Sequence, residues 1–147
     1  MSPEFRNCCV PGIDNAGKMG GLAAESNVAR GIGANKQAGD AMRDIIAARE
    51  APALIEQSFT TVGGVRRIDV LKIGEDIPFS IESKVGRTSL GIRERQELAR
   101  DWWLLRQNRV SGVRWEFSPS GVNGGVGPSP SLQQKLDKLG FETRINP

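Results

Sequence analysis

Residues 65–85 read VRRIDVLKIGEDIPFSIESKV, and they give the clearest indication of the fold. The apolar residues of this stretch fall into two groups separated by a turn at residues 74–76, which predicts two β-strands. Side chains in a strand alternate between the two faces of a sheet, so Glu82 and Lys84 are expected to share one face. Asp69 in the preceding strand is a candidate to oppose them across the ladder.

The elements on either side of this stretch predict an α/β fold, with a mixed central β-sheet flanked by helices. Leu98, Trp102 and Leu105 are expected to form the apolar stripe of the second helix. Ser131 is expected to cap the third helix and Gly140 to end it. The expected order is helix 35–50, strands 58–62, 65–73 and 78–85, helix 90–108, strand 113–117, helix 132–139 and strand 141–145.

The first part of the chain differs in composition from the rest. Residues 1–35 are rich in Gly, Ala, Asn and Ser, which predicts a flexible or loosely ordered N-terminal arm or linker. A short helix around residues 21–29 is an alternative within this arm. Residues 36–147 are expected to form the folded domain. No apolar run approaches the ~20 residues of a membrane span, so we expect none.

The 147-residue chain contains no histidine, which excludes several classes of hydrolytic site. Ser-His-Asp triads, HNH nucleases, paired-histidine ribonucleases and zinc metalloproteases all depend on histidine. The 20 basic and 17 acidic residues give a net charge of +3, which is compatible with nucleic acid as a partner. A site built from Asp, Glu and Lys remains available.

Asp69, Glu82 and Lys84 provide the residue types for such a site. Two carboxylates bind Mg²⁺ or Mn²⁺ through oxygen, and a lysine beside them stabilises charge that develops on a phosphoryl group. The alternative is that all three are solvated charges on an edge hairpin. Their apolar neighbours favour a buried site, but residue chemistry alone leaves both interpretations open.

Several segments resemble the PD-(D/E)xK, or restriction-endonuclease-like, nuclease superfamily. More narrowly, they are similar to toxin domains at the C-terminus of bacterial polymorphic and contact-dependent toxins. The resemblance covers about Gly39 to Ile145, is most specific over Ile81–Leu90, and implies a restriction-endonuclease-like core. The segments that carry it are 39–44, 67–70, 81–90 and 95–101, reading GDAMRD, RIDV, IESKVGRTSL and RQELARD.

The resemblance also implies roles for the motif residues. Asp69 and Glu82 would bind Mg²⁺ or Mn²⁺, with the backbone carbonyl of Ser83 as a further ligand. Lys84 would be the catalytic lysine. We expect Lys84→Ala to abolish cleavage and to leave the fold intact, because Lys84 is expected at a cleft.

Many members of the superfamily add an acidic residue from the first helix. In this chain Ile45 stands where similar toxins carry Glu. Asp44 is the first candidate to replace that acid, followed by Asp40 one turn earlier and then by Glu50. This departure leaves the number of metal ions open.

A further set of residues is expected to contact nucleic acid. The superfamily often places a helix with a Gln beside the site, and arginine binds phosphate in a bidentate manner. For each arginine the alternative is charge balance or an ordinary salt bridge on the surface. The set comprises Gln96, Arg67, Arg87, Arg93 and Arg100.

The function implied by the resemblance is metal-dependent endonucleolytic cleavage of DNA by an antibacterial toxin. Such a toxin would be secreted or delivered as part of a larger protein, act in the cytoplasm of the target cell and have a cognate immunity protein as partner. Cleavage of transfer RNA is the first alternative, because some toxins of this fold cut it. A nucleic-acid-binding module with a decayed site is the second. The biological role rests on the resemblance alone.

Overall fold

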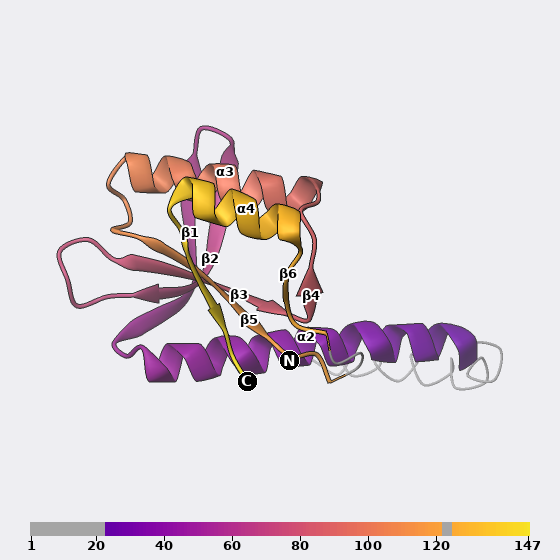
Figure 1. Ribbon diagram of the computed structural model, residues 1–147. Helices are drawn as coiled ribbons and strands as arrows, with labels where there is room; N and C mark the ends of the chain where they lie inside the picture. The colour runs from indigo at the N-terminus through magenta and orange to yellow at the C-terminus, as the bar shows by residue number, and fades with distance from the viewer. Residues whose placement is uncertain (1–22, 122–124) are drawn as a thin grey trace, which may run out of the picture. The chain divides into compact units, whose positions relative to one another are not determined.

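The computed structural model describes residues 23–121 and 125–147, which contain a mixed α/β fold (Figure 1). The chain divides into two compact units, Met1–Ala34 and Asn35–Pro147, and the second unit contains the sheet. Helix α2 spans Ala23–Arg49 and thus starts before residue 35, the start expected from the sequence. Most of the expected N-terminal arm, residues 1–22, lies outside the described residues.

The central sheet has five strands in the order β1-β2-β3-β5-β7. Strands β1 (Ala53–Thr61), β2 (Gly64–Lys72) and β3 (Phe79–Val85) pair in antiparallel fashion. Strands β5 (Val113–Ser118) and β7 (Glu142–Ile145) continue the sheet in parallel with β3. The expected mixed sheet flanked by helices is confirmed, although β1 begins earlier than expected.

The two parallel connections each pass through a helix, as parallel pairing requires a crossover. Helix α3, Ile92–Arg106, links β3 to β5, and helix α4, Pro130–Leu139, links β5 to β7. Two short strands on these connections, β4 (Arg87–Thr88) and β6 (Gly127–Pro128), pair in parallel with each other. None of the described helices is long and apolar enough to cross a membrane.

Helices α3 and α4 cover one face of the sheet, and the part of α2 from Asn35 onward packs on the other (Figure 1). The α2 face is small and includes Ile46, Val70 and Ile81. The larger core lies between the sheet and helices α3 and α4. Its buried members are Ile68, Leu71, Leu98, Leu104, Val110, Val113, Trp115, Phe117, Leu132, Leu136 and Phe141.

The apolar stripe of α3 is only partly as expected. Leu98 is fully buried, but the Trp102 side chain is 44% exposed, so its expected place in the stripe is wrong. Leu104 and the charged residue Asp101 occupy the buried positions instead. The helix therefore turns an acidic group, and not an indole ring, toward the sheet.

Helix α4 begins and ends with recognisable capping residues. Ser129, not Ser131 as expected, is the N-cap, because its Oγ accepts a hydrogen bond of 3.3 Å from the amide of Leu132. Pro130 then occupies the first helical position, where its missing N–H costs nothing. Gly140 ends the helix in the left-handed conformation, with φ of 76°, as expected.

Candidate functional site

The paired part of β2 and β3 ends just before the motif residues. The register pairs Val70 with Ile81, and one further step would pair Asp69 with Glu82, but the pairing stops there. Instead, Oδ2 of Asp69 accepts a hydrogen bond of 2.9 Å from the backbone amide of Ser83. Asp69 therefore opposes β3 through its side chain, because the backbone pairing of the two strands ends at Val70 and Ile81.

The alternation of side chains along β2 also changes at Asp69. Arg66 and Ile68 face α3, since Arg66 bonds to a residue of that helix and Ile68 belongs to the larger core. Strict alternation would put Val70 on the same face. Val70 packs instead against Ile46 of α2. Asp69 thus occupies an irregular position where the strand shifts its faces, and its carboxylate is turned toward a cavity.

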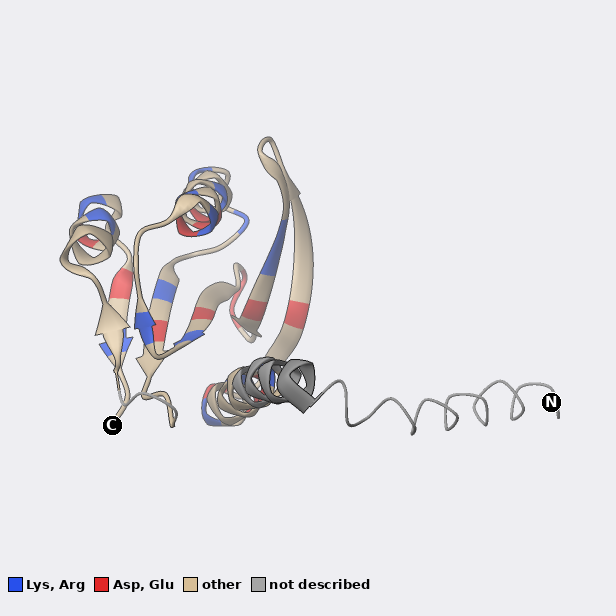
Figure 2. Cartoon of the chain, turned by 90° about the vertical axis from the view of Figure 1, so that its right-hand side faces the viewer, with Lys and Arg blue, Asp and Glu red and all other residues tan. Residues whose placement is uncertain are grey.

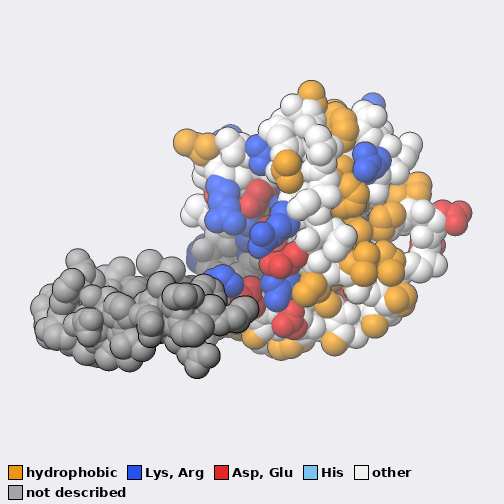
Figure 3. All heavy atoms as spheres, turned by 180° about the vertical axis from the view of Figure 1, so that it is seen from behind, with side chains coloured by type: hydrophobic (Ala, Val, Ile, Leu, Met, Phe, Trp, Pro, Cys, Tyr) orange, Lys and Arg blue, Asp and Glu red, His pale blue; other side chains and the backbone are white. Residues whose placement is uncertain are grey.

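Asp69, Glu82, Ser83 and Lys84 all line this cavity, which has a volume of about 620 Å³. Charged residues lie on the strands of the sheet as well as on the helices (Figure 2). Basic and acidic side chains also gather on the face that Figure 3 shows. The basic residues that line the cavity, besides Lys84, are Lys36, Arg43, Arg67, Arg87 and Arg93.

Lys84 lies between two carboxylates. Its Nζ is 3.0 Å from Oε1 of Glu82 and 2.7 Å from Oε2 of Glu97, which comes from α3. The other oxygen of Glu97 accepts a hydrogen bond of 3.0 Å from Nε of Arg93. Burial opposes the charge on Lys84, but Glu82 and Glu97 outweigh it and raise the pKa of the ammonium group. Lys84 is therefore a fixed positive charge at neutral pH.

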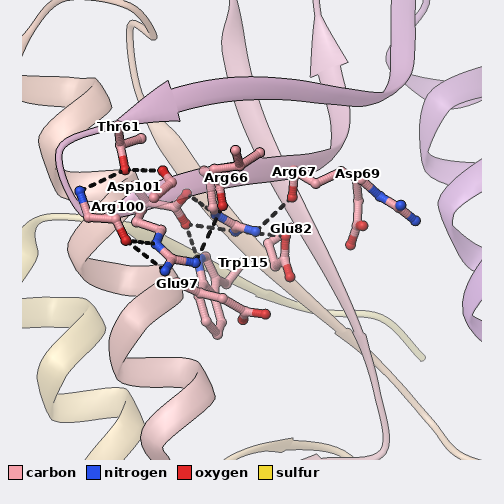
Figure 4. Close-up of polar contacts among 12 residues, drawn as sticks. Thr61, Arg66, Arg67, Asp69, Glu82, Glu97, Arg100, Asp101 and Trp115 are labelled. Atoms are coloured by element: carbon pink, nitrogen blue, oxygen red, sulfur yellow. Dashed lines mark hydrogen bonds and ion pairs between the residues drawn. The ribbon is translucent and has the colours of Figure 1, made fainter.

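Arg66 holds the second oxygen of Glu82. Its Nη2 lies 2.8 Å from Oε2 of Glu82, and its Nε lies 2.6 Å from Oδ1 of Asp101 on α3. Asp101 also accepts a hydrogen bond of 3.1 Å from the indole of Trp115. Figure 4 shows Arg66 between Asp101 and Glu82, with Asp69 beyond Glu82. Burial opposes the charge on Arg66, but the adjacent carboxylates raise its pKa.

These residues form a charge row in which acidic and basic groups alternate and their formal charges cancel. Asp69 is not part of it, and no residue in the described part of the chain forms an ion pair with Asp69. Burial, followed by repulsion from Glu82, raises the pKa of Asp69 to about 7. The charge row consists of Arg93, Glu97, Lys84, Glu82, Arg66 and Asp101.

The donors around Asp69 suit a divalent cation. Carboxylate and carbonyl oxygens are the ligands that Mg²⁺ and Mn²⁺ prefer, and an ionised Asp69 lacks a positive partner. Both oxygens of Glu82 are occupied by Arg66 and Lys84, so Glu82 would have to exchange one of these bonds to bind a metal. Within residues 23–121 and 125–147, no group of three or more His, Cys, Asp and Glu is positioned to hold a metal ion.

The residues expected to contact nucleic acid line two adjoining cavities, and Arg67 and Arg93 line both. Arg67, Arg87 and Arg93 line the larger one. Gln96 and Arg100 line an adjoining cavity of about 280 Å³, to which Asp69 and Glu82 also contribute. The guanidinium of Arg100 donates hydrogen bonds of 3.0 and 2.7 Å to the carbonyl of Gly63 and thereby ties α3 to the β1–β2 turn.

The three candidates for the helix acid lie in different places. Asp40 lines the larger cavity together with Asp69 and Glu82. Asp44, the first candidate, lines neither of the two cavities described above and pairs with Arg43 at 3.0 Å. Glu50 lies at the end of α2 and pairs with Arg49, Lys72 and Arg114. Of the three, Asp40 is the one that lines this cavity, and it too is ion-paired, with Lys36 and Arg43.

Three residues at the site were not anticipated: Glu97, Asp101 and Glu56. Glu97 and Asp101 lie four positions apart on the face of α3 that also carries Leu98 and Leu104, and acids at helical spacing among core residues were a signal in the sequence. Arg66 and Arg67 are adjacent arginines on opposite faces of β2, so the sequence alone does not show which of them faces α3. Glu56 gave no local signal.

Neither a family model, nor a curated protein, nor a solved structure matches this chain. The functional argument therefore depends on the residues and the geometry described above.

Proposed function

We propose that this chain is a metal-dependent nuclease of the PD-(D/E)xK type, which hydrolyses phosphodiester bonds of nucleic acid. The observation that carries the proposal is the position of Asp69. Its carboxylate has no cationic partner in the described part of the chain, its pKa is raised to about 7, and it shares a cavity with a buried Glu-Lys pair and a basic rim. Perturbed acids in a cleft are typical of functional sites.

The element order supports a restriction-endonuclease-like core. Helix α2, strands β1 to β3, helix α3 and strand β5 follow the order helix, three strands, helix, strand that the resemblance implies. The motif residues lie on β2 and β3, where those strands separate. This arrangement supports catalysis at the point where β2 and β3 separate.

In the proposed mechanism Asp69 and Glu82 hold Mg²⁺ or Mn²⁺, with the carbonyl of Ser83 as a further ligand. A bound divalent ion neutralises phosphate charge and lowers the pKa of water. Lys84 presents its ammonium group to the charge that develops on the scissile phosphate. Glu97 and Arg93 keep Lys84 in position. Because the chain contains no histidine, the leaving oxygen would be protonated by a metal-bound water or by bulk solvent.

DNA is the proposed substrate, and the biological role is that of a toxin effector paired with an immunity protein. Delivery as part of a larger protein into the cytoplasm of a competing cell belongs to the same proposal. These parts rest on the resemblance of residues 39–145 to toxin domains. RNA is included in the test because some toxins of this type cut transfer RNA.

A non-catalytic nucleic-acid-binding module is the second candidate. The observation that favours it is that both oxygens of Glu82 are already paired with protein cations, and that Asp44 lies away from the cavity. Such a module would bind nucleic acid with a strong dependence on salt and would not cut it.

The test compares cleavage of plasmid DNA and of total RNA in Mg²⁺, in Mn²⁺ and in EDTA. Asp69→Asn is the main variant, because the amide oxygen still accepts the hydrogen bond from Ser83 while the negative charge is lost. Glu142→Gln is the matched control: it removes the same charge from a side chain that is 59% exposed and pairs with Arg114.

Cleavage that requires metal, persists in Glu142→Gln and disappears in Asp69→Asn supports the nuclease and identifies its polymer. Cleavage in EDTA, or equal cleavage by Asp69→Asn, overturns the assigned site. If the folded protein cuts neither polymer but binds one of them, the binding module is the better account.

A further inference from the structure

Arg43 on α2, Glu56 on β1 and Arg67 on β2 meet at the cavity that contains Asp69 and Glu82. Nη1 of Arg43 lies 2.9 Å from Oε1 of Glu56, and Nη2 of Arg67 lies 2.8 Å from the same oxygen. Two guanidinium groups from different elements therefore converge on one carboxylate oxygen. The Nη atoms of a guanidinium match the spacing of two oxygens on a carboxylate or a phosphate.

The backbone of Glu56 is unusual for a residue in a strand. Its φ is 54°, in the left-handed region that side chains other than glycine rarely adopt. The register pairs Ile55 with Val70 and Gln57 with Ile68, and skips Glu56 and Asp69 between them. Strained residues cluster at functional sites, where the strain aims a side chain. Here it brings the Glu56 carboxylate to the arginines of the cavity.

The two arginines are held to different degrees. The Arg43 side chain is only 14% exposed and also pairs with Asp40 and Asp44. The Arg67 side chain is 64% exposed, and Glu56 is its one ion-pair partner within the described residues. Arg43 therefore anchors Glu56, whereas Arg67 is free to exchange Glu56 for another anion.

We propose that Arg67 binds a backbone phosphate of a nucleic-acid strand in this cavity, and that Glu56 occupies Arg67 until the strand arrives. The inference rests on the proposed function, since it takes nucleic acid to be the ligand of the cavity. A phosphodiester carries one negative charge and two free oxygens, so it replaces the carboxylate on Arg67 without leaving a charge unpaired. Exposed ion pairs contribute little stability, which makes the exchange easy.

Glu56 thus acts as an internal competitor of the substrate. It lowers the affinity for any polyanion that cannot make further contacts in the cavity. Removing its carboxylate is expected to tighten binding of nucleic acid, whereas removing a carboxylate elsewhere changes binding only through the net charge of the protein.

The experiment measures equilibrium binding of a fluorescent DNA duplex and of a fluorescent RNA hairpin by anisotropy, in EDTA and at one fixed salt concentration. The variants are Glu56→Gln, Arg67→Gln and the double variant. Glu142→Gln and Lys138→Gln serve as charge-matched controls on exposed residues that do not line the cavity. Glu56→Asn is a second version of the first variant, because Asn tolerates the left-handed backbone.

We expect Glu56→Gln and Glu56→Asn to bind roughly two- to fivefold more tightly than Glu142→Gln, which is the scale of one released ion pair. Arg67→Gln should bind more weakly than Lys138→Gln. In the Arg67→Gln background, the Glu56 substitution should give no gain beyond that of Glu142→Gln, because Arg67 is absent and Arg43 stays paired with Asp40 and Asp44.

Three outcomes overturn the inference: a gain no larger than that of Glu142→Gln, a gain that persists without Arg67, or no binding of either nucleic acid by the unaltered chain. Because the assay contains no metal, it is independent of cleavage. If the chain cuts nucleic acid but the Glu56 substitutions do not change binding affinity, only the proposed role of Glu56 is rejected. If the variants show the expected binding pattern but the chain cuts no nucleic acid, the role of Glu56 stands and the proposed nuclease activity is rejected.

Discussion

The backbone amide of Ser83 donates a hydrogen bond of 2.9 Å to Oδ2 of Asp69, which joins β3 to β2 beyond their last paired residues. One carboxylate oxygen of Asp69 is therefore used to hold the two halves of the motif together. A residue at this position needs an acceptor for the fold and a negative charge for a cation. Asn provides the first without the second, and so it separates the two requirements.

Asp69→Asn is expected to change how stability depends on pH. The folded state keeps the Asp69 proton up to a pKa of about 7, whereas the ordinary aspartate pKa of 3.8 applies to the unfolded chain. Between these values the folded state binds more protons, so Asp69 makes the native chain less stable as pH rises, by at most about 1.4 kcal/mol per pH unit. Asn does not titrate and removes this contribution.

Urea unfolding in EDTA, from pH 4.5 to pH 8, measures the effect. The difference in unfolding free energy, variant minus unaltered chain, should increase with pH and level off above about pH 7. Glu142→Gln, which removes an exposed carboxylate, is measured alongside as the control. A flat difference for Asp69→Asn would mean that the Asp69 carboxylate is not destabilised by its surroundings.

Divalent metal is expected to stabilise the folded chain through Asp69. An ion that binds only the native state raises the unfolding free energy by about 1.4 kcal/mol when its concentration is ten times the dissociation constant. The effect should be larger at pH 8 than at pH 6, since Asp69 binds a cation only after it loses its proton. Thermal unfolding with and without Mn²⁺ measures it, and an equal shift in Asp69→Asn would rule out Asp69 as a ligand.

Lys84→Ala is expected to cost stability as well as activity. The Lys84 side chain is only 13% exposed and pairs with Glu82 and Glu97, so its removal leaves two buried carboxylates without their shared cation. Breaking a buried pair in this way costs about 3–5 kcal/mol. The earlier expectation of an intact fold changes for this reason, although cleavage should still be lost.

The double variant Lys84→Ala/Glu97→Gln separates the two effects. Neutralising Glu97 should recover part of the lost unfolding free energy in urea, because one of the two carboxylates that lost Lys84 then carries no charge. Cleavage should remain absent, since the ammonium group is still missing. Recovery of cleavage together with stability would show that Lys84 acts only through the fold.

Arg66→Met is expected to be the most destabilising single change in the charge row. Asp101 is fully buried, and its cation partner is Arg66, which also holds Glu82. The expected loss is about 3–5 kcal/mol, as for other buried pairs that lose one member. Adding Asp101→Asn should restore part of it. For comparison, Lys36→Gln breaks an exposed pair with Asp40 and should cost less than about 1 kcal/mol in urea unfolding.

Local patterns in the sequence were sufficient to predict much of the sheet and one part of the site. Alternation in β3 placed Glu82 and Lys84 on one face, and their 3.0 Å ion pair agrees with that expectation. The left-handed Gly140 also followed from a local rule. The start of α4 at Ser129 was missed, although Pro130 at the first helical position was a visible indication.

Features that depend on several elements could not be predicted. The irregularity at Asp69 requires the separation of β2 from β3 and the left-handed Glu56 on β1, and nothing in residues 65–85 shows either. The burial of Arg66 depends on Asp101, which lies on α3 and is distant in the sequence. Trp102 was misplaced because the acid at position 101 replaces an apolar residue on the buried face.

The alternation of sign along the charge row has a consequence for inheritance. Glu82, Lys84 and Glu97 each touch an opposite charge on both sides, so a mutation that alters one of them disturbs two bonds at once. A lineage that acquires such a mutation regains the lost ion pairs only through a second, compensating mutation at a neighbouring position. Descendants of this chain should therefore keep positions 66, 82, 84, 97 and 101 together or exchange them in pairs, while the exposed position 142 drifts independently.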